Sequence, residues 1–526
     1  MLRTRQSRTS GCHLAQDAFS HCLGHENLYC RRHTHPSGSW RTLFKRRYSA
    51  IFTRAPRLTL CSRTHHYPPS ALDDERLTRW VRDVAAARHL AHTSPQREAD
   101  ILALGLAVKE ANCPPGQRYL YNNTNFVLLA EIIRRVTGMD ADAFRREAIY
   151  EPLGMRSTGA WASDDHAMPH LATGYIASGL GQFVRGVHLL GIAGDVVTSC
   201  LDDMVTWVNT LRSGVLGEVS ITESMARRTV VSNGDEVWCG LGLAVRDYRG
   251  RRLYCHTGSQ PGYKTHIAYM PARDFGMVLL SNREEIGPTV CCVELMESLY
   301  QGEFPRLHPC ATTSTQLQNS GLTSRQLECL DGTYIDAVAG EMITIRLQNG
   351  ILHGDMLGVP LVLYPVGSGC FASGDDYQVE QPATLTFATD NSCENVTCKA
   401  VIGGFTGHFV KVVAPALDQT ALQAYVGRYE NAQLGSVHTI TLETDDQLYI
   451  QYGAGFDGAR KFPMQPVGRD DFLVRPTAPG IAYQHLFRFS RDAQDSIIGV
   501  AVSMERLKRF WLTRQPERVA ASSTPV

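Results

Sequence analysis

The sequence predicts an α/β domain followed by two antiparallel β-barrels, and three observations support this order. Residues 114–300 contain a helix-period apolar run and then several short apolar strands. A polar stretch rich in Ser, Thr and Gln follows, and we interpret residues 306–326 as a linker. Beyond it the chain repeats itself at an offset of about 95 residues, with strand periodicity and no helical periodicity.

Composition limits the classes of protein that the chain can represent. Its 526 residues suggest two to four domains, and a hydrophobic content of 43% is enough for globular cores. Basic and acidic residues balance at 52 each, so the charge does not indicate a nucleic-acid partner. No apolar run approaches the roughly twenty residues of a membrane span, so we expect no membrane partner. The fifteen scattered cysteines predict reduced thiols and a cytoplasmic location.

The first 66 residues differ from the rest of the chain. They hold twelve Lys or Arg and two acidic residues, which leaves 40 basic and 50 acidic residues elsewhere. No sustained apolar periodicity is present, so we expect no core here. A targeting presequence, a disordered basic arm and a wrongly assigned gene start remain open, and we favour the last. The pairs Cys22-x-x-His25 and Cys30-x-x-His33 lie too close together for a zinc module, so we predict no metal site.

Within the α/β domain, one helix and three strands are predicted with definite positions. Apolar residues at helical spacing predict a helix that ends at Gly138: Phe126, Leu129, Ile133 and Val136. Further along, short apolar runs predict strands at 253–255, 267–270 and 277–280, with the last two joined by the turn 271–274. This alternation supports an α/β domain, which we place at residues 72–305.

Two short motifs in this domain carry candidate chemistry. Tyr121-Asn122-Asn123 lies on a loop just before the predicted helix, where a phenol can relay protons and the Asn123 amide can hold a carbonyl. His256-Thr257-Gly258 continues a predicted strand, and Gly258 and Gly262 allow a substrate backbone to approach the strand edge. Taken alone, each motif is more typical of an ordinary turn.

Together, the two motifs resemble those of the penicillin-recognising serine hydrolases, which include β-lactamases, DD-peptidases and related esterases and aminopeptidases. That family carries S-x-x-K, Y-x-N and K-T-G or H-x-G in this order. The segments AIYEPLGMRSTG (148–159) and GIAGDVVTSCLDDMVTWVNTLRSG (191–214) are also similar to family sequences, and the resemblance covers about residues 72–300. It implies a β-lactamase-like fold, with Tyr121, Asn123 and His256 as catalytic residues and Thr257 and Gly258 as substrate-binding residues.

The nucleophile motif of that family is missing. No serine in the chain is followed by lysine three positions later. The segment RLTLCSRTHHY (57–67) resembles the family's nucleophile segment, which places Ser62 at the serine position and His65 at the lysine position. A histidine can serve as base to a serine. Pro68 and Pro69 follow at once, however, and proline opposes the helix that the family forms there.

The repeat begins at Gly332-Thr333-Tyr334 and again at Gly427-Arg428-Tyr429, and short strands follow each start. This pattern predicts β-barrels at 327–415 and 420–515. A serine hydrolase domain followed by two lipocalin-like barrels is similar to the bacterial D-aminopeptidases of the superfamily. In those enzymes a loop of the last barrel binds the substrate amine through an acidic residue. Residues 453–460 correspond to that loop, with Asp457 and Arg460 as the candidate substrate-binding residues.

The resemblance therefore implies a D-aminopeptidase-like serine hydrolase that releases N-terminal D-amino acids from short peptides or amides through an acyl-enzyme. It implies no cofactor and no metal. The expected partners are a small peptide or amide substrate and a second copy of the chain in a homodimer. Two alternatives stay open. One is a carboxylesterase or DD-peptidase, because the same site serves many acyl substrates. The other is a binding pseudoenzyme, because S-x-x-K is absent.

Overall fold

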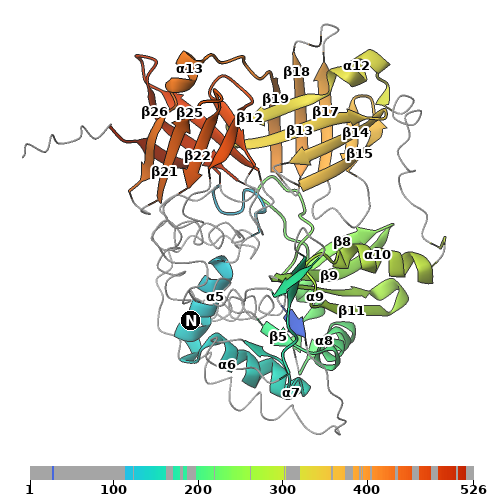
Figure 1. Cartoon of the computed structure of the whole chain (residues 1–526). Coiled ribbons are helices and arrows are strands. Elements are labelled where there is room, and N and C mark those ends of the chain that lie inside the picture. Colours follow the sequence, from blue (N-terminus) through green and yellow to red (C-terminus); the bar gives the residue numbers. More distant parts are fainter. Residues whose placement is uncertain are drawn as a thin grey trace, which may run out of the picture.

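The computed structural model places the α/β domain below two β-barrels, as Figure 1 shows. The prediction of an α/β domain followed by two antiparallel barrels is confirmed. The structure describes these residues: 26–28, 113–121, 124–160, 170–177, 182–185, 197–217, 219–260, 262–300, 302–303, 320–356, 359–373, 383–389, 393, 395–402, 405–432, 436–452, 461–475, 484–504 and 508–516.

The centre of the α/β domain is a four-stranded antiparallel sheet in the order β11-β10-β9-β8. The predicted strands lie within it, and the turn at 271–274 is a 3-10 turn, η3 Pro271–Arg273, closed by Asp274 with φ of 46°. The sheet strands are β8 Ala244–Tyr248, β9 Arg251–Gln260, β10 Tyr263–Met270 and β11 Phe275–Ser281.

Helices cover both faces of this sheet, and alternation along β10 determines which residues meet them. Ile267 and Tyr269 join a core that includes Met204 and Trp207 of α8 Leu201–Ser213. Their neighbours Ala268 and Met270 point to the opposite face and pack with α10 Pro288–Leu299. The remaining elements of the domain are α6 Ala141–Arg145, η2 Arg146–Tyr150, α7 Glu151–Leu153, α9 Thr222–Met225, β2 Gly159–Ala160, β3 Tyr175–Ala177, β4 Phe183–Arg185, β5 Val197–Ser199, β6 Val215–Leu216 and β7 Val219–Ser220.

The predicted helix is α5, Thr124–Thr137. Leu129 and Ile133 are buried in the same core as Trp207, so the apolar stripe faces the sheet. Gly138 ends the helix with φ of 76°, and its N–H donates to the carbonyl of Arg134 at 2.9 Å. A glycine in the left-handed conformation is the usual helix terminator.

Each C-terminal barrel closes from eight antiparallel strands (Figure 1). Barrel 1 consists of β12 Gly332–Asp336, β13 Glu341–Gln348, β14 Ile351–Met356, β15 Val359–Gly367, β16 Cys370–Ser373, β17 Ala383–Thr389, β18 Val396–Ile402 and β19 Phe405–Val412. Barrel 2 consists of β20 Gly427–Asn431, β21 Ser436–Leu442, β22 Leu448–Tyr452, β23 Phe462–Pro466, β24 Asp471–Val474, β25 His485–Arg491, β26 Ile497–Ser503 and β27 Phe510–Arg514. Closure leaves no open sheet edge, and apolar side chains fill each interior.

The two barrels repeat the same local structure, as the sequence repeat predicts. Each is preceded by a short helix, α12 Ser324–Cys329 or α13 Gln419–Gln423, which the strand periodicity did not predict. The Tyr334 hydroxyl donates to the carbonyl of Leu330 at 2.8 Å. The Tyr429 hydroxyl donates to the carbonyl of Tyr425, also at 2.8 Å. The repeat therefore preserves a buried tyrosine that ties the first strand of each barrel to the preceding turn.

Residues Glu26–Leu28 form β1, which pairs in parallel with β5. Backbone pairing along a strand edge needs no apolar periodicity, so this strand is compatible with the expectation that residues 1–66 build no core. One expectation from the sequence is wrong. The expectation of reduced thiols fails at one pair, because Cys329 and Cys393 form a disulfide with Cα atoms 5.3 Å apart. The separation of 64 residues hid this pair from sequence spacing.

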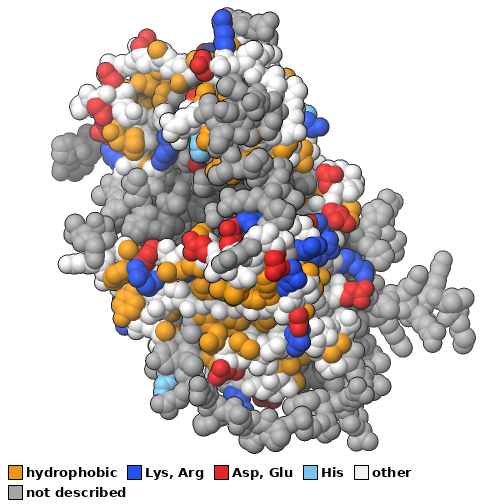
Figure 2. Space-filling view, turned by 90° about the vertical axis from the view of Figure 1, so that its right-hand side faces the viewer, with side chains coloured by type: hydrophobic (Ala, Val, Ile, Leu, Met, Phe, Trp, Pro, Cys, Tyr) orange, Lys and Arg blue, Asp and Glu red, His pale blue; other side chains and the backbone are white. Residues whose placement is uncertain are grey.

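The surface of one side of the molecule is visible in Figure 2. Lys and Arg side chains are interspersed there with Asp and Glu, and no single-sign region dominates this face. Apolar side chains gather in a band on the α/β domain in this view. Helix α10 carries three exposed apolar side chains, Val290, Leu295 and Leu299. Among the helices that the structure describes, none is long and apolar enough to cross a bilayer.

Candidate functional site

Tyr121 ends a loop that runs under the barrels, and we call residues 113–121 the Tyr121 loop (Figure 1). The loop is fastened to the domain core immediately before Tyr121. Tyr119 is buried, and its ring meets the Trp238 ring edge-on with centroids 5.2 Å apart. Tyr121 itself is half-buried and packs against the same small cluster as Trp238. The loop thus presents the phenol from a packed support.

His256 lies on β9, beyond the point where the neighbouring strand stops. Strand β8 pairs with Arg251–Cys255 only, whereas β10 pairs with β9 as far as Gln260. Within the described chain, no strand pairs with Thr257–Gln260 on the β8 side. An edge of this kind offers backbone N–H and C=O groups to an extended ligand, which can add as a further strand.

The structure brings Tyr121 and His256 together. Their ring centroids are 6.2 Å apart, with the ring planes inclined by 37°. The alternation of β9 explains the encounter: His256 pairs with Ile267 of β10, and paired residues point to the same face of a sheet. Ile267 belongs to the core that α5 covers, so His256 points to the side on which the Tyr121 loop enters that helix. The expected proximity of these two residues is confirmed.

The contacts of His256 assign its tautomer. Its Nδ1 lies 2.8 Å from the carbonyl oxygen of Thr257, and a carbonyl only accepts, so Nδ1–H is the donor. In the neutral ring Nε2 is then the acceptor. The neighbouring His266 is buried, and burial, together with the charges of Arg246 and His256, lowers its pKa to about 3. His266 is therefore neutral beneath the motif, and the His256 imidazole lies at the strand edge.

Gly262 plays a different part from the one expected. A Cβ there would lie 2.7 Å from the backbone of Gly174 and Tyr175, and its φ is 87°. Its N–H donates to Glu284 Oε2 at 2.6 Å. Gly262 therefore admits the chain's own backbone, and the expectation that it admits a substrate is wrong. Gly258, by contrast, is buried on the open edge of β9, directly opposite Thr265.

Of the other candidate residues, the structure places Thr257. Thr257 is exposed on β9 beside His256. The remaining candidates lie outside the described residues: Ser62, His65, Asn123, Asp457 and Arg460. Their roles stay predictions, as do the catalytic roles of Tyr121 and His256.

Sequence reasoning missed three residues that shape the site. Arg118, Trp238 and His266 lie beside the two motifs but belong to no motif themselves. The only signal in the sequence is the position of Arg118, three residues before Tyr121 in the same loop. Trp238 and His266 reach the site through the fold of the sheet, which spacing along the chain does not reveal.

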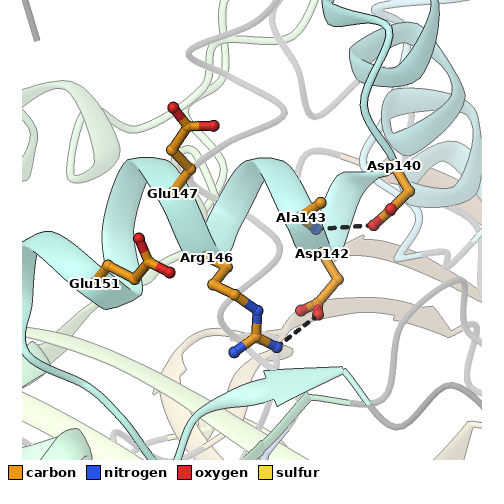
Figure 3. A pocket seen from close by; sticks show the side chains of 6 residues that line it. All are labelled: Asp140, Asp142, Ala143, Arg146, Glu147 and Glu151. Carbon is orange, nitrogen blue, oxygen red and sulfur yellow. Dashed lines mark hydrogen bonds and ion pairs between the residues drawn. The ribbon is translucent and has the colours of Figure 1, made fainter.

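A separate hollow of about 370 Å³ lies on the helices of the α/β domain (Figure 3). Neither Tyr121 nor His256 lines it. Two of its acidic side chains have partners nearby, since Asp140 caps α6 by accepting from Ala143 N and Asp142 accepts from Arg146 at 3.1 Å. These are ordinary helix-capping and i,i+4 contacts. In the described part of the chain, no group of His, Cys, Asp or Glu side chains is arranged to hold a metal ion.

Comparison with known proteins supports the family resemblance. The Beta-lactamase family model matches residues 60–290. A D-aminopeptidase of Gluconobacter oxydans is 26% identical over 218 residues, which are 40% of this chain and 41% of the relative. A D-aminopeptidase of Brucella anthropi is 31% identical over 160 residues, 30% of each chain. Penicillin-binding protein 4* of Bacillus subtilis is 29% identical over 186 residues, 32% of this chain and 41% of the relative. The matches thus span less than half the length of these relatives.

A solved structure, the octameric penicillin-binding protein homologue from Pyrococcus abyssi, aligns with 66% of this chain and 77% of its own. The TM-score is 0.40 and the identity 19%. The family match covers both described motifs, with Tyr121 beside His256 at the open edge of β9. Residues 60–290 therefore match the Beta-lactamase family in one continuous stretch that contains Tyr121 and His256.

Proposed function

We propose that this chain is a serine hydrolase that releases N-terminal D-amino acids from short peptides or amides through an acyl-enzyme. The observation that carries the proposal is the Tyr121 ring beside His256 at the open edge of β9, within a domain of a serine-hydrolase family. The similarity to D-aminopeptidases supports the substrate class.

The proposed reaction assigns a role to each candidate residue. The Ser62 hydroxyl oxygen attacks the carbonyl carbon, and His65 takes its proton. The C–N bond of the amide breaks, and Tyr121 relays the proton to the leaving amine. Water then hydrolyses the ester and regenerates the serine. Asn123 holds the acyl amide.

The strand edge and the barrel loop bind the substrate in this proposal. Thr257 and Gly258 pair with the substrate backbone beside His256, as the open edge of β9 allows. Backbone N–H groups stabilise the oxyanion, each contributing on the order of 3 kcal/mol. Asp457 or Arg460 then determines whether a free amine or a blocked, acidic ligand is preferred.

One observation favours a second function. The chain lacks Ser-x-x-Lys, and loss of a nucleophile alone reduces turnover by about a millionfold. A protein that keeps the Tyr121–His256 pair and the strand edge without this nucleophile binds the same ligands and releases them unchanged. Weak or absent turnover with retained binding is the property that identifies this alternative.

The test uses the purified full chain with a fluorophosphonate probe and with D-alanine p-nitroanilide. We expect slow labelling at Ser62 and slow hydrolysis, both reduced at least tenfold in Tyr121→Phe because the proton relay is lost. Tyr175→Phe, an exposed tyrosine on β3, is the matched control and should behave like the parent. Saturable binding of the amide without labelling would instead support the binding protein. Cleavage of phenyl esters, but not of amides, would support an esterase.

A further inference from the structure

We propose that Arg118 is a positioning residue that holds the Tyr121 loop against β9. It does so by binding the seam between the two barrels, by which we mean the contact of Glu341 in barrel 1 with Lys508 in barrel 2. The inference rests on the proposed function only in treating Tyr121 as a site residue. It assigns to the barrels a mechanical role in the α/β domain that does not depend on the loop at 453–460.

Arg118 leaves its own domain and ends in a buried ion cluster. Its Nη2 lies 3.5 Å from Glu341 Oε1, although the residues are 223 positions apart, and only 8% and 3% of the two side chains is exposed. The guanidinium carbon also lies 4.7 Å from the centre of the Phe405 ring on β19. Arginine is suited to such a site because it pairs and stacks at once.

Glu341 joins the Tyr121 loop to both barrels. It begins β13 of barrel 1, and its Oε2 accepts a hydrogen bond from Lys508 Nζ, between β26 and β27 of barrel 2. The Lys508 ammonium also donates to the carbonyl of Met504 at 2.9 Å. One carboxylate thus receives a cation from the α/β domain and a cation from the second barrel. Loss of Glu341 leaves two buried cations without their shared carboxylate, and loss of either cation leaves one carboxylate oxygen without its ion pair, so the three act together.

The hairpin that carries Glu341 is itself held in place. The Asp336 carboxylate accepts from the backbone N–H of Val338, Ala339 and His408, at 3.0, 2.8 and 2.8 Å. A Cβ at Gly340 would lie 2.6 Å from Ser503 Oγ, so the hairpin packs directly on barrel 2. Glu341 is therefore presented from a braced turn at the seam.

Neighbouring residues of the Tyr121 loop are anchored in different domains. Arg118 is fixed at the barrel seam, and Tyr119 is fixed against Trp238 of the α/β domain. Further back, the Gly116 carbonyl accepts from both the N–H and the hydroxyl of Ser232. Arg118 is adjacent to Tyr119 and three residues before Tyr121. Release of Arg118 from Glu341 therefore removes one of the two anchors next to Tyr121, and we expect the phenol to shift relative to His256.

The experiment places 3-fluorotyrosine at position 121 of the full chain and records its fluorine NMR signal. We expect the signal to shift or broaden in Arg118→Met, Glu341→Gln and Lys508→Met. Arg118→Lys, which keeps the charge, should restore it in part. The double variant of Arg118→Met with Glu341→Gln should move it no further than either single change, because both break one cluster.

Arg346→Met is the matched control, since Arg346 also lies on β13 but pairs at the surface with Asp331. It should leave the fluorine signal unchanged. An unchanged signal in all three cluster variants, with cooperative melting retained, would overturn the proposal. So would additive effects in the double variant.

A second measurement needs no substitution and no enzymatic turnover. Hydrogen exchange of the unmodified chain is followed through a urea series. The Tyr121 loop should lose protection at the urea concentration at which β13 loses it. The proposal would be contradicted if the Tyr121 loop lost protection together with α5 while β13 remained protected. Because neither readout requires catalysis, failure of this inference and failure of the proposed function are distinguishable.

Discussion

His438 is a single buried residue whose surroundings determine its protonation. His438 lies inside barrel 2, with its Nε2 3.2 Å from Ser436 Oγ and its ring edge-on to Tyr452. Burial lowers the pKa of His438 to about 4. In the unfolded chain a histidine has its ordinary pKa of about 6.5. The folded protein therefore holds a neutral ring over a pH range in which the unfolded chain takes up a proton.

This difference predicts an acid-dependent loss of stability that His438→Gln reduces. The contribution of His438 to the free energy of unfolding is fully present above about pH 6.5. It is lost as the pH falls from there to about 4, because only the unfolded state binds the proton in this range. The loss amounts to on the order of 3 kcal/mol for this one group. Urea unfolding at several pH values, followed by hydrogen exchange in β21, measures it. The control is His408→Gln, at an exposed position on β19, which should keep the parent's dependence of unfolding free energy on pH. The same pH dependence in the parent and in both variants would exclude His438 as the cause.

Among whole elements, the hairpin of β9 and β10 carries the candidate site and depends on Gly262. The sequence predicted these strands, because their apolar residues alternate and turn residues separate them. It did not predict that Gly262 abuts Gly174 and Tyr175, because that contact joins segments about 90 residues apart. The turn between β8 and β9 provides a comparison, since Gly250 has φ of 75° and open space around its Cβ position.

The two glycines separate backbone strain from steric clash. Gly250→Ala should cost about 1–2 kcal/mol, because alanine is disfavoured in the left-handed conformation. Gly262→Ala carries the same strain and a clash with fixed backbone, so its cost should exceed that of Gly250→Ala by about 1–3 kcal/mol. Thermal unfolding of both variants measures the difference. Equal melting temperatures would mean that segment 174–175 yields easily to the new methyl group.

For the molecule as a whole, the missing nucleophile motif has more consequence than any packing detail. The family match begins at residue 60 and so includes Ser62 and His65. The pair Pro68-Pro69 follows within three residues of His65 and opposes a helix there. In the proposed mechanism, nucleophile and base act as a unit, so a poor Ser62–His65 pair would limit turnover even with Tyr121 beside His256.

Replacing the segment ahead of Leu72 with a helix that carries Ser-x-x-Lys should raise D-alanine p-nitroanilide hydrolysis by several orders of magnitude. The serine and its lysine base would then complete a site whose Tyr121–His256 pair is already assembled. Steady-state kinetics of the parent and the redesigned chain measure the gain, and a redesign with Ala in place of the new serine is the control. Robust hydrolysis by the parent would refute the prediction and make Ser62 and His65 the first residues to substitute.

The sequence by itself determined the domain order, the helix α5, the strands around His256 and the two motifs. Each of these depends on local periodicity, turn residues or short spacing, and each such pattern lies within a short stretch of the sequence. Only the tertiary structure decided the encounters between distant segments. It placed Tyr121 beside His256, Arg118 on Glu341 223 residues away, and Cys329 on Cys393 64 residues away. Such contacts depend on how packed elements approach one another in space, and no local pattern encodes that approach.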